Sequence, residues 1–211
     1  MNPKKQSYEN LADSLIEKFN TRGFEGYYVE TKEDALAMVE RFLTPSCSVT
    51  WGGSESIKEI GLIESLKNSD YIVLDRSTCV TEDDQREFYS KAVASDFFFM
   101  SSNAITLNGE LVNIDGNGNR VACLITGPKN VIIIAGMNKI TTDVRSAIDR
   151  VRNIASPPNA VRLNKNTPCA KFGRCGDCLN DDCICCHTVV TRKSKTPGRI
   201  KIVLVGEELG Y

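Results

Sequence analysis

The sequence predicts an α/β protein in which helices cover both faces of a sheet. Short apolar runs alternate along the chain with segments whose apolar residues recur at helical spacing, which is the rhythm of an α/β fold. The run Val131-Ile-Ile-Ile134 contains four consecutive branched residues, and such a run is typical of a strand buried on both faces. The carboxyl end of this strand, residues 136–139, is where α/β folds place ligands.

Each predicted element has a local signal. Residues 8–19 form an amphipathic helix that Gly23 can end, and Thr31 begins a second helix with a capping-box pattern. A third helix carries Ile57 to Leu66, and Thr81 opens a polar fourth helix. The remaining helix spans 141–151, and Pro157-Pro158 is expected to stop it. The other predicted strands are 26–30, 48–51, 71–75, 96–100 and 199–205.

Length and composition indicate one globular domain over residues 1–211. The chain has 211 residues, is 41% hydrophobic and carries a net charge of −1, so it can bury a substantial core without a general attraction to nucleic acid or anionic membranes. No apolar stretch approaches the roughly 20 residues that cross a bilayer, and no apolar signal core follows the first residues. We expect a cytoplasmic protein that binds neither nucleic acid nor membrane, and oligomerisation stays open.

Glycines follow the strand that ends at Trp51. Gly52, Gly53 and Ser54 stand between this strand and a helix, so they could let the backbone approach an anion. A tight turn with Ser54 as helix cap is the simpler interpretation of these three residues alone.

The stretch Asp115-Gly-Asn-Gly-Asn119-Arg120 resembles the start of a calcium loop but lacks the later ligands of an EF-hand. The sequence leaves two alternatives, a hairpin connection or an anion site built on Arg120. After Gly136, Asn138 and Lys139 precede a helix, where Lys139 could hold an anion or simply be exposed.

Six of the nine cysteines lie between Cys169 and Cys186, within the weakly periodic segment 159–197 that is inserted before the last strand. Such clustering in a reducing compartment indicates metal ligation, and four thiolates suit either zinc or a [4Fe–4S] cluster. A nucleic-acid-binding zinc knuckle lacks aromatic partners apart from Phe172, and a redox pair at Cys175 and Cys178 lacks its usual position at the start of a helix. His187 is the only histidine, which excludes a multi-histidine zinc site and leaves no evident nucleophile triad.

Taken together, several stretches resemble the LUD-domain family of lactate-utilisation proteins. They are Trp51-Gly-Gly-Ser54, Asn103-Ala-Ile-Thr106, Gly109-Glu-Leu-Val-Asn-Ile-Asp115 continuing to Arg120, Gly127-Pro-Lys-Asn-Val131, Gly136-Met-Asn-Lys139, Pro158-Asn-Ala160, Thr167-Pro-Cys169 and Gly206-Glu-Glu-Leu-Gly210. They extend over nearly the whole chain.

The resemblance implies a Rossmann-like sheet of the kind found in ribose-5-phosphate isomerase, glucosamine-6-phosphate deaminase and CoA transferases. In that fold a small anionic metabolite binds in loops at the strand ends. The implied ligand-binding residues are Gly52, Gly53, Ser54, Asn103, Asp115, Asn119, Arg120, Asn138, Lys139 and Glu207.

The resemblance also implies metal ligands at Cys169, Cys175, Cys178 and Cys185, with Cys183 and Cys186 additional. Relatives belong to an iron–sulfur system that oxidises L-lactate, so we expect either a [4Fe–4S] cluster with iron–sulfur partner subunits or zinc. The alternative is a stand-alone enzyme acting on a phosphorylated or carboxylated metabolite, with structural zinc; a nucleic-acid-binding zinc module is less favoured. No G-x-G-x-x-G follows a strand, so no flavin or nicotinamide site is predicted, and no catalytic residue is assigned.

Overall fold

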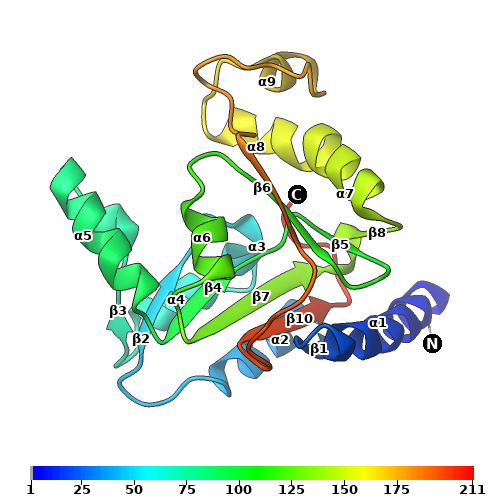
Figure 1. Ribbon diagram of the computed structural model, residues 1–211. Helices are drawn as coiled ribbons and strands as arrows, with labels where there is room; N and C mark the ends of the chain where they lie inside the picture. Colours follow the sequence, from blue (N-terminus) through cyan, green and yellow to red (C-terminus); the bar gives the residue numbers. More distant parts are fainter. Residues whose placement is uncertain (1) are drawn as a thin grey trace.

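A six-stranded parallel sheet forms the centre of the computed structural model, which describes residues 2–211 (Figure 1). The strands in spatial order are β1 (Glu25–Val29), β10 (Ile200–Val205), β7 (Asn130–Gly136), β4 (Phe97–Met100), β2 (Ser48–Trp51) and β3 (Ile72–Val73). Every neighbouring pair is parallel. The carboxyl ends of the strands therefore meet at one edge of the sheet, and the predicted Rossmann-like α/β architecture is confirmed.

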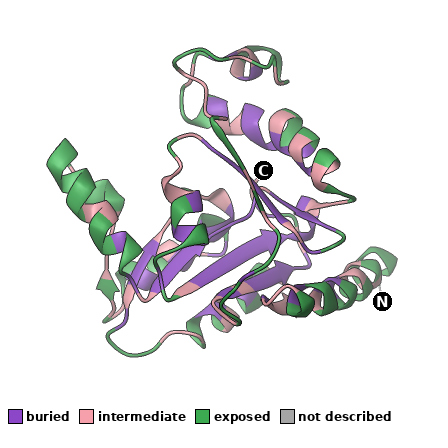
Figure 2. Cartoon of the chain, viewed as in Figure 1, coloured by how far each residue is buried: buried purple, intermediate pink, exposed green. Residues whose placement is uncertain are grey.

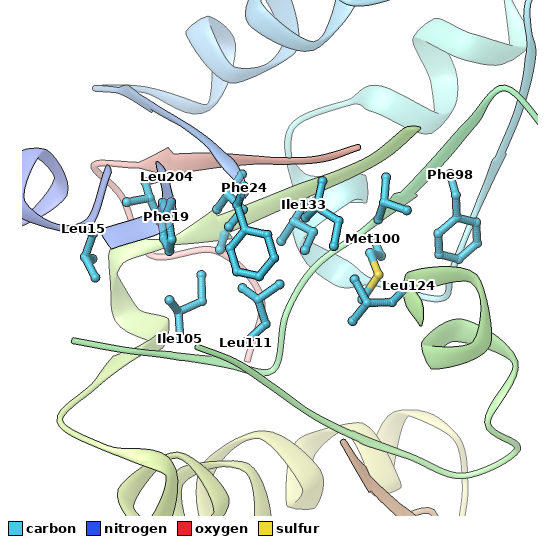
Figure 3. Packing of buried hydrophobic residues seen from close by; sticks show 14 of the residues in the cluster. Leu15, Phe19, Phe24, Phe98, Met100, Ile105, Leu111, Leu124, Ile133 and Leu204 are labelled. Atoms are coloured by element: carbon cyan, nitrogen blue, oxygen red, sulfur yellow. The ribbon is translucent and has the colours of Figure 1, made fainter. Parts of the chain in front are cut away.

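Helices cover both faces of this sheet, as the branched run in β7 indicates. Val131 and Ile133 pack into a core with α1, whereas Ile132 and Ile134 pack into a second core with α2, α3 and α4. Figure 2 shows the buried strands, and Figure 3 shows part of the first core. The helices before β4 are α1 (Pro3–Thr21), α2 (Lys32–Glu40), α3 (Glu55–Glu59), α4 (Leu62–Lys67), the 3₁₀ turn η1 (Arg76–Thr78) and α5 (Glu82–Val93).

A second, smaller sheet lies between the main sheet and the helices of residues 144–162 (Figure 1). Its strands in order are β8 (Ile140–Thr141), β5 (Ala104–Thr106), β6 (Leu111–Asp115) and β9 (His187–Thr191). Ile105 and Leu111 face the main core (Figure 3), while Ala104 and Val112 pack against α7 (Val144–Arg150). This sheet carries the end of β6, and with it Asp115, to the edge where the main strands end.

The stretch after Asp115 is a helix, α6 (Asn119–Ile125). The expected hairpin connection is therefore wrong. Asp115 Oδ1 accepts a hydrogen bond of 2.8 Å from the Gly118 amide, and Gly118 has a φ of 81°, which turns the chain into the helix. The helix is short and stable only because it buries Val121 and Leu124 against the core.

The prolines Pro157 and Pro158 do not stop the helix that begins at Val144. A π-helical turn, η3 (Val151–Ala155), continues it directly into α8 (Ser156–Arg162). The prolines lie in the first turn of α8, where backbone N–H groups need no partner within the helix. The wide π turn interrupts the regular hydrogen-bond ladder at that point and so makes room for them.

The return of the last strand to the main sheet predicts that the cysteine segment lies against that sheet. This prediction is wrong, because the segment packs on the outer helices. A short helix, α9 (Pro168–Phe172), lies beside α8, and the amide of Cys186 donates 3.0 Å to the carbonyl of Asp115. The chain then enters β9, which was not predicted, and returns to the main sheet as β10, which was. No helix in residues 2–211 is both long and apolar enough to cross a bilayer.

Candidate functional site

A cavity of about 450 Å³ lies where the strands end. The loops after β2 and β4 supply Gly53 and Ser101, and the 3₁₀ turn η2 (Met137–Lys139) after β7 supplies Lys139. The loop after β6 and residues 181–184 of the cysteine segment form further walls. This volume falls within the range of small-molecule sites, and the position is the one expected for an α/β sheet.

Seven of the predicted ligand-binding residues line the cavity, namely Gly53, Ser54, Asn103, Asp115, Asn119, Arg120 and Lys139. Gly52, Asn138 and Glu207 do not. Gly52 packs against the Arg120 side chain. The Asn138 Oδ1 atom accepts from the Leu209 amide at 3.2 Å, and Glu207 Oε2 accepts from the Lys32 amide at 3.3 Å. These last two side chains fix the backbone of neighbouring segments.

Arg120 binds the walls of the cavity to one another. Its five N–H groups donate to oxygens of Asp115, Ser101, Asn113, Asn103 and Ile114 at 2.6–3.2 Å. A guanidinium has five such donors, so none remains for a ligand. Asp115 also neutralises its charge. Arg120 thus joins the loops after β4 and β6, and the expected direct contact between Arg120 and an anion has no free donor to make it.

Lys139 is the buried amine of the site. Its side chain reaches between α3 and the end of β4, where Nζ donates to Ser56 Oγ at 2.8 Å and to Ser101 Oγ at 2.9 Å. Burial lowers the pKa of Lys139 to about 7; the positive charges of Arg150 and Arg120 act in the same direction, and Glu59 opposes them. A large fraction of this lysine is therefore neutral near pH 7.

Arg150 adds positive charge near Lys139, and Arg76 adds positive charge on the cavity wall. Arg150 is buried and donates to the carbonyls of Asn138 at 3.0 Å and Asn103 at 2.8 Å. Arg76 is exposed on the cavity wall beside Gly53. Within residues 2–211, neither arginine forms an ion pair.

The other lining cations, by contrast, are neutralised. Arg162 pairs with Glu55 at 3.2 Å and Lys165 pairs with Asp182 at 3.3 Å. Among the described residues that line the cavity, Arg76 and Lys139 are therefore the basic side chains without an ion pair, and Asp181 is the acidic one.

Sequence reasoning missed Ser56, Ser101, Arg76 and Arg150. Ser101 had a usable signal, because it directly follows a fully buried strand whose carboxyl end had to reach the same edge as the others. Ser56, Arg76 and Arg150 had none, since each is a single polar residue within a helix. Only the tertiary fold brings Ser56 and Arg150 to Lys139 and Arg76 to the cavity wall.

The cysteine thiols gather beside α8 with polar partners on several sulfurs. Hydrogen bonds link Cys169 Sγ to Thr167 Oγ1 at 3.2 Å and Cys185 Sγ to Ser156 Oγ at 3.3 Å, and Cys175 Sγ accepts from Arg152 Nε at 3.2 Å. Such donors suit thiolates bound to a metal. In the part of the chain that the structure describes, however, no three Cys, His, Asp or Glu side chains are arranged as ligands of one ion. The metal set Cys169, Cys175, Cys178 and Cys185 stays a prediction.

The family model of the LUD domain matches residues 12–205. The chain belongs to the LUD-domain family. This LUD-domain protein is also similar in structure to a DUF162-family protein from Deinococcus radiodurans, with a TM-score of 0.52 and 12% identity over 94% of this chain and 97% of that one. That likeness concerns the fold.

A ribose 5-phosphate isomerase from Plasmodium falciparum is 21% identical over 53% of this LUD-domain protein and 52% of its own chain, with a TM-score of 0.33. A TM-score this low supports no argument about function. No curated protein matches the sequence.

Proposed function

We propose that this LUD-domain protein binds a small carboxylate metabolite, a 2-hydroxy acid or the matching 2-oxo acid, as a component of lactate utilisation. The family is associated with lactate utilisation in general. The observation that carries the proposal is a pair of buried basic side chains that form no ion pair among residues 2–211. Lys139 lines the strand-end cavity, and Arg150 donates to the carbonyl of the lining residue Asn103.

An anion is the ligand that this charge distribution favours. A buried cation without a counter-ion is costly, and an anion in the cavity would offset that cost. Ser54, Ser102 and Asn103 add polar groups to the lining that can orient a carboxylate or a hydroxyl.

Arg76 is the residue that we expect to hold the carboxylate. Its side chain has no hydrogen bond or ion pair within the described residues, and its guanidinium is near Gly53 on the cavity wall. A planar guanidinium binds a carboxylate through two parallel hydrogen bonds, and these charge-assisted bonds are among the stronger ones in proteins.

The cysteine segment supports a metal site next to the ligand. Cys169, Cys175, Cys178 and Cys185 would hold a [4Fe–4S] cluster or zinc, with Cys183 as a further thiol on the cavity wall. An iron–sulfur cluster supplies electron transfer when bound, which suits 2-hydroxy-acid oxidation together with iron–sulfur partner subunits. Zinc would serve structure instead.

Calorimetric titration of the full chain with L-lactate and pyruvate tests the proposal. We expect saturable binding of both acids, and we expect Arg76→Ala to weaken it by about tenfold or more, because loss of a charge-assisted hydrogen bond costs about 1.5–3 kcal/mol. Arg86→Ala is the matched control, since Arg86 is an exposed arginine away from the cavity, and its affinity should be unchanged.

Absence of binding by either acid at millimolar concentrations would contradict the proposed ligand class. If Arg76→Ala and Arg86→Ala weakened the binding of the acids equally, the proposed binding site at Arg76 would be contradicted. Anaerobic purification with iron, sulfide and zinc analysis tests the metal separately: about four iron atoms per chain indicate electron transfer, and one zinc indicates a structural ion.

A further inference from the structure

We propose that the Nζ atom of Lys139 is a nucleophile that forms an imine with the carbonyl carbon of a 2-oxo acid bound in the cavity. This inference rests on the proposed function, because the 2-oxo acid must first occupy the same cavity. It goes further by giving the protein a covalent step and by assigning that step to one residue.

The hydrogen-bond acceptors around Lys139 match the N–H groups of a neutral amine but not those of an ammonium group. The Ser56 hydroxyl donates to the Leu209 carbonyl at 3.3 Å, and the Ser101 hydroxyl donates to the Ser102 carbonyl at 3.3 Å. Both serine oxygens are therefore acceptors toward Lys139, at 2.8 and 2.9 Å. Two N–H groups of a neutral amine match these two acceptors and leave the lone pair free.

The protonated form would have a third N–H group. No third acceptor for Lys139 occurs among residues 2–211. Lys139 lines the cavity, so we expect a ligand there to reach its amine.

The charges that face Lys139 also favour the neutral amine. Arg150 and Arg120 act against protonation, and Glu59 is the acidic group that acts in its favour. Glu59 already accepts a hydrogen bond of 2.7 Å from the Gly210 amide. A lysine desolvated beside other cations is the usual way in which a protein makes an amine nucleophilic at neutral pH.

The chemistry balances without an oxidant or reductant. The Nζ lone pair attacks the carbonyl carbon, and one N–H proton moves to the former carbonyl oxygen to give a carbinolamine. The second N–H proton then passes to that hydroxyl, which leaves as water as the C–O bond breaks and the C=N bond forms. Ser56 and Ser101 hold the amine during the attack, while Arg76 can hold the carboxylate. L-lactate has a hydroxyl at the same carbon, so it can bind but cannot form an imine.

Reductive trapping tests the inference. The full chain is incubated with pyruvate and borohydride, and intact mass followed by peptide mapping locates the adduct. We expect one predominant adduct per chain, on the peptide that contains Lys139. Lys139→Arg should lose it, whereas Lys195→Met, which removes an exposed lysine that does not line the cavity, should keep it.

The pH profile of trapping in the unmodified protein gives a second readout that needs no variant. The amine reacts when deprotonated, so the rate at Lys139 should rise with pH through about 7, whereas an ordinary surface lysine should follow a pKa near 10.4. Trapping of Lys139 with the pH profile of a surface lysine would overturn the inference.

Titration with L-lactate separates the two ideas. Binding of lactate and pyruvate with no adduct, or with adducts spread over surface lysines, would overturn the imine while leaving the proposed ligand class intact. No binding and no adduct would overturn both.

Discussion

Arg120 shows at the scale of one residue how the site is built. Its five hydrogen bonds hold the loops after β4 and β6 in place, and its charge meets Asp115, which is 8% exposed. Arg120→Ala leaves that carboxylate buried without its partner. We expect the free energy of unfolding to fall by about 3–5 kcal/mol, as measured by urea denaturation.

Arg86→Ala provides the comparison for that measurement. Arg86 is exposed and has no ion pair among the described residues, so its removal should change stability by no more than about 0.5 kcal/mol. A loss below about 1 kcal/mol for Arg120→Ala would show that the two loops hold their positions without it.

The same residue shows what the sequence could predict about the site. The family resemblance implied that Arg120 lies in a strand-end loop, and Arg120 does line the cavity at the strand ends. The sequence could not show that protein acceptors occupy all N–H groups of Arg120, because two of these acceptors belong to Asn113 and Asn103, which reach it from other elements. Lys139 was likewise placed by its strand, but its two serine partners come from α3 and from the end of β4, and no local pattern connects them.

At the scale of the elements, the cysteine segment is a peripheral unit. It packs on α8 and on the end of β6, away from the two cores of the main sheet. Cys178→Ser should therefore lower the bound metal and speed amide exchange over residues 165–190, while amides of β7 and β10 stay protected. Hydrogen exchange with mass spectrometry and metal analysis check both parts.

Cys79→Ser is the control, because Cys79 lies beside η1 and outside the segment; its metal content should equal that of the unmodified protein. Loss of protection in β7 with Cys178→Ser would mean that the segment supports the whole fold and is not peripheral.

Two elements show why local patterns mislead here. α6 has only seven residues and no side-chain cap hydrogen bond, so its stability comes from the core that it covers. Pro157 and Pro158 normally mark a helix end, yet a π turn before them allows the helix to continue. Both outcomes depend on tertiary contacts that a window of sequence does not contain.

At the scale of the whole molecule, the main sheet was predictable because its strands β4 and β7 consist almost entirely of apolar residues, which indicates burial on both faces. The smaller sheet was not. Its strand β9 is partly exposed and pairs with β6, which lies more than 70 residues earlier in the chain. That pairing closes the site, since it brings the cysteine segment over the strand ends.

The central claim is that a small carboxylate occupies the cavity between the Gly53 and Asp115 loops and meets Lys139. A crystal structure of the full chain grown with pyruvate tests it most directly. We predict pyruvate in that cavity, with its carboxylate toward Arg76 and its carbonyl carbon at Lys139 Nζ. Pyruvate bound elsewhere on the molecule, with the cavity free of it, would contradict the account.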